Sequence, residues 1–571
     1  MSSKRETSLL AWLPATAWLP SCSAETIRAD VVAGIALAAL LIPEGMAYAG
    51  IAGVAPQAGL FAAAIGLFVY AVFGSSRHLA VSATSGSAAM LAALVGPLAG
   101  GDVGKYALLA SATAVSVGIL LLIGATFKLG FVSEFIAKPV LKGFVFGLSL
   151  TIMLRQLPKM LGIEKGTGDF FDQLRHLIFS LKHTHPLTLA IGAAALAITF
   201  GLGAVAPRVP SALVVFVGGI LLVRLFGLEQ RGIEVVGAMQ GGMPHFMPPN
   251  VGRDHWFELL TGAVGIVLIL YAEALAAGRT FAAKNKYEID SNQELAALGA
   301  ANIASGLFQG IVVGGGMSGT AANAAGGART QLSAMVTSLL TILTLGFLMP
   351  LFRNLPEAVL AAIVIHAVAH LADVSELKRF ARLRTGSIWV SLTALAGVLA
   401  FGILKGLVLA ICLTLIALMK KLSTPQESVL GRLHATGTFV DIKRYPEAEL
   451  IPGLLIFRPN GMLFFANANR VTNHLRKLVK DSTQPLNAVI LNLEAVPEID
   501  VTSLDLLEQL RGELNSAGIR LYLARVTDPV KDLFSLSGFR ERLGEGRIFW
   551  GVDTAVDSYL QSTARSAGSS V

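Results

Sequence analysis

The feature that most constrains this chain is a series of long apolar runs between Val31 and Met419. Many are close to the roughly 20 residues that an α-helix needs to cross a bilayer. Only 14% of the 571 residues are charged and 54% are hydrophobic, whereas soluble domains carry roughly 25% charged residues. The sequence therefore predicts a polytopic α-helical protein embedded in a lipid bilayer.

We expect fourteen spans, of which the third and the tenth are short. Their approximate bounds are 31–52, 57–74, 84–98, 105–126, 131–154, 187–206, 210–227, 256–278, 293–312, 318–328, 332–352, 356–371, 387–403 and 405–420. An even number of spans places both termini on one side. Basic residues gather after even-numbered spans, as in 279–286 and 378–384, and such loops face the cytoplasm. We therefore expect cytoplasmic termini in a cell membrane, and these loops explain the net charge of +8 better than nucleic-acid binding does.

Two stretches rich in glycine and hydroxyl residues interrupt the apolar sequence: VSATSGS at 81–87 and IVVGGGMSGTAAN at 311–323. Irregular backbone at membrane depth survives only where protein or a watery cavity covers it, so each break suggests a binding cavity. A helix that begins at Ser318 or Thr320 would direct free N–H groups and a positive dipole end at an anion. For one break alone, close contact between glycine-rich helices is an equal alternative. The second break favours the cavity.

An internal repeat is visible in the order of these features. Each half of the membrane sequence contains an acidic residue within an apolar span, then a further span, then one of the two breaks. Seven spans in each unit would place the second copy upside down relative to the first. Inverted repeats with paired interrupted helices are typical of transporters whose site lies near the middle of the bilayer.

The two acidic residues are Glu44 and Glu273. A carboxylate at membrane depth is costly when ionised, so each should pair or stay protonated part of the time, as a proton carrier does. A structural alternative remains for each: Glu44 could bond the backbone that Pro43 leaves free, and Glu273 could brace a neighbouring helix. Tyr48 shares a helix face with Glu44 and on spacing alone is expected to pack.

The two ends of the chain differ from its middle. Residues 1–30 contain a proline-broken apolar patch that we expect to be an interfacial segment, not a cleaved signal peptide. After residue 421 the pattern becomes that of a soluble α/β domain, with strands expected at 454–458, 462–465, 488–493 and 519–524 and helices at 469–479, 503–516 and 529–535. Cys22 and Cys412 lack the spacing of a disulfide framework or metal site.

Several motifs together resemble the SulP sulfate permease family of anion transporters. They lie at Asp30–Gly34, Ile42–Ala49, Ala52–Pro56, Phe73–His78, Tyr287–Leu295 and Leu355–Ile365, and the C-terminal part is similar to a STAS domain. The resemblance implies a seven-plus-seven inverted repeat shared with uracil permeases, with a core of spans 1–4 and 8–11 and a gate of spans 5–7 and 12–14. We accordingly expect a transport domain at 31–421, a linker at 422–436, a STAS domain at 437–562 and a flexible tail at 563–571. A homodimer with STAS contacts is also implied.

The family's anion site lies between the short helices of spans three and ten, with a contribution from span one. The resemblance thus makes Tyr48 a lining residue. The expected anion-binding residues are Tyr48, Ser82, Thr84, Ser85, Ser87, Met317, Ser318, Gly319 and Thr320. Three departures matter: many members have arginine at Gly319, many have glutamine at Glu44, and Ser82-Ala83 replaces Gly-Pro. The site therefore loses a fixed positive charge and gains a titratable negative one.

These observations predict a secondary active transporter, not an enzyme, with no cofactor. Its substrate would be a small anion of the sulfate, bicarbonate or dicarboxylate class, moved with protons by an elevator-like movement. Protonation of Glu44, the expected coupling group, would remove repulsion of the anion, so anion and proton would favour each other's binding. Glu273 is the second candidate for proton coupling. The alternatives are an exchanger or uncoupled anion pathway, sodium-coupled bicarbonate uptake with Glu273 near the cation, and a membrane-anchored scaffold or sensor.

In the STAS-like domain, Thr502 and Ser503 match the position of a phosphorylatable residue in related domains. An ordinary helix cap by Thr502 or Ser503 is the alternative. We expect this domain to act in regulation or dimer contacts.

Overall fold

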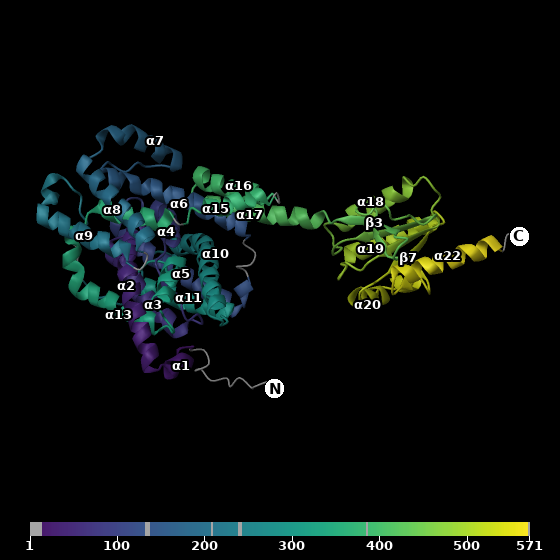
Figure 1. The fold of residues 1–571 in the computed structure, drawn as a ribbon, viewed down its shortest axis with the longest axis horizontal. Helices are drawn as coiled ribbons and strands as arrows, with labels where there is room; N and C mark the ends of the chain where they lie inside the picture. Colours follow the sequence, from purple (N-terminus) through teal and green to yellow (C-terminus); the bar gives the residue numbers. More distant parts are fainter. Residues whose placement is uncertain are drawn as a thin grey trace. The chain divides into compact units, whose positions relative to one another are not determined.

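A computed structural model of the chain describes residues 14–131, 137–206, 209–237, 242–369, 371–383 and 386–568. The chain forms two compact units that divide between Thr414 and Leu415 (Figure 1). Residues 1–13 of the expected N-terminal segment, Arg384 of the basic loop and residues 569–571 of the expected tail lie outside these ranges.

The first unit is helical, and a helix lies at each position where a span is expected. These helices are α2 (Ala24–Ala52), α3 (Pro56–Phe73), α4 (Ser85–Ala99), α5 (Val103–Thr126), α6 (Lys138–Leu161), α8 (Pro186–Val205), α9 (Ser211–Phe226), α10 (Arg253–Lys284), α11 (Ser291–Leu307), α12 (Met317–Ala325), α13 (Leu332–Leu343), α14 (Glu357–Ala369), α16 (Ser387–Phe401) and α17 (Ile403–Ser423). Among the described residues, nine helical segments are long and apolar enough to cross a membrane. The unit also contains α1 (Ala15–Trp18) and the amphipathic helices α7 (Phe170–Ser180) and α15 (Val374–Arg382).

The largest difference from the expected spans concerns the fifth, which begins at Lys138 instead of residue 131 and ends at Leu161. Proline is favoured at the first helical positions and Pro139 occupies one of them, while Gly162 closes the helix in the left-handed conformation (φ 64°). The local helix signals therefore placed this boundary better than hydrophobicity did.

The same order of elements occurs in both halves of the first unit. Each half has a two-residue strand before its short third helix, namely β1 (Val81–Ser82) and β2 (Gly314–Gly315), and an amphipathic helix between its fifth and sixth long helices, namely α7 and α15. Strands β1 and β2 pair antiparallel. Equivalent elements that run in opposite directions are what an inverted repeat requires.

The contacts of the first unit divide its helices into two sets. Helices α2–α5 and α10–α13 contact mainly one another, and α6, α8, α9, α14 and α16 form the second set. Glycines permit the closest approaches within each set: a Cβ on Gly59 would lie 2.0 Å from the carbonyl oxygen of Gly45, and one on Gly143 would lie 2.0 Å from that of Ser391. Small residues at such crossings let membrane helices approach each other.

The second unit is built on a six-stranded sheet of order β4-β3-β5-β6-β7-β8. The strands are β3 (Glu427–Arg432), β4 (Phe439–Asp441), β5 (Leu454–Pro459), β6 (Ala488–Asn492), β7 (Arg520–Ala524) and β8 (Ile548–Phe549). Strands β5 to β8 are parallel, and β3 is antiparallel to both of its neighbours.

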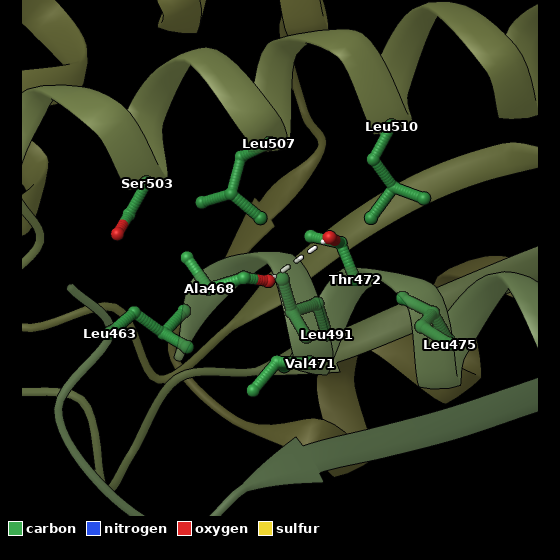
Figure 2. Close-up of a pocket in the computed structure, with 9 residues that line it drawn as sticks. All are labelled: Leu463, Ala468, Val471, Thr472, Leu475, Leu491, Ser503, Leu507 and Leu510. Carbon is green, nitrogen blue, oxygen red and sulfur yellow. Dashed lines mark hydrogen bonds between the residues drawn. The ribbon is translucent and has the colours of Figure 1, made fainter. Parts of the chain in front are cut away.

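Helices cover both faces of this sheet, because alternate strand residues point to opposite sides. Leu455, Val489 and Leu521 face a core shared with α18 (Ala468–Lys480), α19 (Val501–Ser516), α20 (Asp528–Leu536) and α21 (Phe539–Leu543). Their neighbours in sequence face α22 (Val552–Gly568) on the other side. A small cavity of about 10 Å³ remains between α18 and α19, lined almost entirely by apolar side chains (Figure 2).

Three boundaries of this unit differ from expectation. Strand β3 lies in the expected linker, and α22 continues to Gly568 through most of the expected tail. The stretch 462–465 is not a strand and makes only an isolated bridge between Leu463 and Ile499. Strand β3 alternates buried and less buried residues over only a few positions, so its short pattern was hard to distinguish from a linker.

Candidate functional site

The two breaks meet in space. In the β1–β2 pair, Val81 lies opposite Gly315 and Ser82 opposite Gly314. A Cβ built on Gly316 would lie 3.5 Å from Cγ2 of Thr84. Since Thr84 and Gly316 are the N-cap residues of α4 and α12, the beginnings of these two helices are neighbours.

The N-terminus of α4 is capped by hydroxyl groups of its own residues. The Ser87 N–H donates to Oγ1 of Thr84 at 3.2 Å, and the Thr84 N–H donates to Oγ of Ser87 at 3.1 Å. This reciprocal capping fixes the first turn and leaves its positive dipole end in place. Ser82, Ser85 and Ser87 are all buried.

The start of α12 is more open, because its N-cap Gly316 has no side chain to accept a hydrogen bond. The helix begins at Met317, before the Ser318 or Thr320 that the sequence suggested. Met317 and Ser318 are exposed in this first turn. Thr320 is buried, donates to the Gly316 carbonyl at 2.6 Å and accepts from the Ala80 N–H at 3.3 Å. It ties α12 to the residues before β1 and does not face an open space.

Side chains of neighbouring helices satisfy the irregular backbone at both breaks. Asn302 donates to the Val313 carbonyl at 2.8 Å and accepts from the Val313 N–H at 2.9 Å, and Ser305 donates to the Ile311 carbonyl at 2.6 Å. On the other side Gln331 donates to the Leu79 carbonyl at 3.0 Å. The sequence reasoning missed these supports, although a polar residue such as Asn302 inside a membrane helix signals a buried partner.

Glu44 and Tyr48 lie on α2, which packs against both α4 and α12. Both side chains are buried, and they lie about one helical turn apart. The expectation that they share one face of the helix is therefore met in the structure. Within the described part of the chain, no hydrogen bond of ordinary length and angle is recorded for the Glu44 carboxylate.

Glu273 approaches the beginning of α4. Both of its carboxylate oxygens lie 3.5 Å from the position that a Cβ on Gly86 would occupy. Gly86 is in the first turn of α4, where the helix dipole favours negative charge. The structure thus brings the acid of the second half to the helix end of the first half, a contact that sequence spacing does not predict.

Gly319 faces away from these helix ends. A Cβ there would lie 3.3 Å from Cδ2 of Leu41 and 3.4 Å from Cβ of Ala80. A longer side chain at this position would have to pass the leucines of α2 before it reached Glu44, which follows Leu41 by less than one turn.

Two further acidic residues in the first unit are saturated with hydrogen bonds. Glu294 accepts from the Tyr70 hydroxyl at 2.7 Å and from the N–H and hydroxyl of Ser75 at 2.9 and 2.7 Å. Asp30 accepts from the Arg329 N–H at 2.6 Å and the Thr330 hydroxyl at 2.6 Å. Such bonding satisfies the buried carboxylate oxygens, which distinguishes these two residues from Glu44 and Glu273.

The regulatory candidates of the second unit are in different environments. Thr502 is exposed, whereas Ser503 is buried beside the cavity of Figure 2. The cap of α19 is neither of them but Asp500, which accepts from the N–H and the hydroxyl of Ser503 at 2.8 and 2.6 Å. Burial alone would raise the pKa of Asp500, but the hydrogen bonds from Ser503 and Phe465 hold that pKa below its ordinary value.

Two family models match the sequence. The model of the sulfate permease family matches residues 27–394, and the model of the STAS domain matches residues 445–555. A "Probable sulfate transporter" of Mycobacterium tuberculosis is 34% identical over 548 residues, with 96% of this chain and 98% of that protein covered. "Sulfate transporter 1.3" of Arabidopsis thaliana is 30% identical over 581 residues, with 95% of this chain and 87% of that protein covered.

Solved structures share the fold. The murine solute carrier 26 family member A9 anion transporter, in an inward-facing state, has a TM-score of 0.89 at 21% identity and covers 98% of this chain and 96% of its own. The transmembrane domain of the cyanobacterial bicarbonate transporter BicA has a TM-score of 0.60 at 23% identity, covering 69% of this chain and 98% of its own.

Proposed function

This chain belongs to the sulfate permease family, and from that premise we propose that it carries a small anion across the membrane together with protons. The family consists of transporters, and the expected fold class of a helical membrane unit with a STAS domain is confirmed. Proton coupling, the elevator movement, the homodimer and the cytoplasmic location of both termini are parts of the proposal.

The observation that carries the proposal is the meeting of two helix beginnings at the β1–β2 pair. The N-caps Thr84 and Gly316 are neighbours, so two positive dipole ends act on one region. The exposed Met317 and Ser318 would contact the anion from α12, and Ser85 would contact it from α4. The bound anion is stabilised by backbone N–H groups and hydroxyls, without a fixed cation at Gly319.

Coupling is assigned to the two acids that lack full hydrogen bonding. Glu44 lies on a helix that packs on both α4 and α12, and Glu273 lies at the first turn of α4. When either is ionised it repels an anion at the same helix ends, and a proton removes that repulsion. Because linkage is reciprocal, the anion then favours protonation to the same degree. We place the principal coupling step at Glu44, with Glu273 contributing.

The two sets of helices supply the moving parts. Helices α2–α5 and α10–α13 hold both breaks and both acids, and they would move as the core against the second set as the gate. The sites of alternating-access carriers lie at such repeat interfaces. Sulfate is the first substrate to test, because the relatives reported above are named as sulfate transporters. Bicarbonate and dicarboxylates follow.

Uptake into proteoliposomes under an imposed pH gradient tests the proposal. Acid outside should drive radiolabelled sulfate above its equilibrium level, and Glu44→Gln should retain sulfate binding while losing this accumulation. Glu258→Gln, the same chemical change at an exposed position of α10, is the control and should accumulate normally.

The rival mechanisms give different results in the same assay. Uptake that depends on a sodium gradient and not on pH would show that the carrier is coupled to sodium and not to protons. Uptake that requires an anion on the opposite side would indicate an exchanger. Unchanged accumulation by Glu44→Gln would show that Glu44 is not the coupling group.

A further inference from the structure

Helix α15 (Val374–Arg382) is a short amphipathic helix attached to the second helix set. Phe380 is buried on one face, where α15 contacts α6 and α16. The opposite face exposes Lys378 and Arg382, which lie one turn apart. The helix therefore presents paired cations away from the protein interior.

A third cation lies at the beginning of α15, where it is paired. Nζ of Lys142 on α6 lies 4.0 Å from Oδ2 of Asp373, the N-cap residue of α15, and both side chains are partly exposed. Arg379 is paired with Glu376 at 3.1 Å. Within the described ranges, no ion pair is recorded for Lys378 or Arg382. The charge of this face is thus left without a protein partner at the two residues that point outward.

Exposed apolar side chains indicate where α15 lies relative to the membrane boundary. Val374 at its beginning and Leu383 just beyond its end are 50% and 56% exposed. Trp389, in the first turn of α16 and seven residues after Arg382, is 71% exposed. Tryptophan concentrates at the boundary between hydrocarbon and headgroups, and a helix with apolar and basic residues lies in that plane. A helix in that plane would hold the cations at the level of lipid phosphates.

We propose that Lys378 and Arg382 form a binding site for the headgroup of an anionic phospholipid. The lipid phosphate would lie on the outward face of α15 and the acyl chains would pass Trp389. Basic surfaces between transmembrane helices at the membrane boundary are suited to such headgroups. The equivalent helix of the first half, α7, has phenylalanines and few cations on its exposed face, so the site belongs to one side of the membrane unit only.

Trp389 provides a reporter within the site. The protein is reconstituted in phosphatidylcholine with a fraction of phosphatidylglycerol, with bromine on the acyl chains of one lipid at a time. The fluorescence quenching of Trp389 is obtained by subtracting the quenching measured in the Trp389→Phe protein, which retains the other tryptophans. Each cation near the lipid surface should raise the affinity for an anionic lipid roughly fivefold. The native protein should therefore prefer phosphatidylglycerol by at least fivefold, and the double variant Lys378→Gln/Arg382→Gln should lose most of this preference.

Two controls separate charge from folding. Lys378→Arg/Arg382→Lys conserves both charges and should keep the preference, and Arg175→Gln/Lys182→Gln removes two exposed charges near α7 and should not alter it. Equal quenching by both lipids in the native protein, or an unchanged preference in the double glutamine variant, would overturn the proposal. Displacement of the brominated phosphatidylglycerol by millimolar glycerol phosphate would also overturn it, because a soluble phosphate would then be the ligand.

Discussion

Replacing Glu273 by glutamine removes a charge from the beginning of α4 with little change in shape. Its carboxylate oxygens lie 3.5 Å from the Cβ position of Gly86 in the first turn of α4. For an anion held by the first-turn N–H groups we take a separation of about 5 Å from this carboxylate. At an effective dielectric constant of about 20, two unit charges at that distance repel by roughly 3 kcal/mol, and a divalent anion is repelled about twice as strongly.

The expected result follows from this repulsion. In the native protein the dissociation constant for sulfate should rise with pH as Glu273 ionises, by up to roughly four orders of magnitude for the doubled repulsion of about 6 kcal/mol. The Glu273→Gln protein should bind sulfate more tightly than the native protein at alkaline pH, because the repulsion from Glu273 is absent. Its remaining pH dependence would come from Glu44.

Isothermal titration of the protein in nanodiscs with sulfate, from acid to alkaline pH, measures this directly. Glu258→Gln on the same helix is the matched control and should follow the native curve. If the native affinity is independent of pH, or if Glu273→Gln keeps the full native slope, Glu273 does not repel the anion and its position beside Gly86 has only a structural role.

Three further substitutions test other parts of the structure. Gly319→Arg should strengthen sulfate binding at alkaline pH by about tenfold and flatten its pH dependence, because a permanent charge replaces the proton; an unchanged slope in the same titration would contradict this. Asn302→Ala removes both bonds to Val313 and should cost about 2–6 kcal/mol, seen as a lower melting temperature of the purified protein; an unaltered melting temperature would argue against this support. Asp500→Ala should cost the C-terminal unit about 1 kcal/mol of unfolding free energy at neutral pH. Since the pKa of Asp500 is lowered in the folded state, this stabilisation is present above the ordinary carboxyl pKa of about 3.9 and is lost as pH falls through the folded-state value. Urea unfolding of that unit should show the two proteins converging in acid, and a difference that persists there would refute the role of the ionised cap.

The helices of the membrane unit could be predicted because lipid imposes a length and an apolar composition on every span. The breaks at 81–87 and 311–323 could be recognised for the same reason, since polar and glycine-rich backbone is conspicuous there. The precise start of α6 and the short strand β3 were missed, because caps and pairing partners determine these boundaries more than hydrophobicity does.

The geometry of the site was harder to predict from the sequence. The pairing of Ser82 with Gly314, the approach of Glu273 to Gly86 and the direction of Gly319 toward Leu41 join residues that are far apart in sequence. A pattern along one chain shows that two helix ends exist but not that they are neighbours. The role of Asn302 was the most predictable of the omissions, since an amide in an apolar helix requires a partner.

The saturated acids would hold the first helix set together as one body in the proposed elevator movement. Asp30, from the first half, accepts from Arg329 and Thr330 of the second half. Glu294, from the second half, accepts from Tyr70 and Ser75 of the first. Each half therefore supplies one carboxylate that binds the other half, and truncating either would leave several buried donors without partners. With two such ties across the pair of repeats, the β1–β2 contact and both helix ends would keep their geometry during the proposed movement. An elevator needs this property, because an anion site built from two halves works only if the halves do not separate during transport.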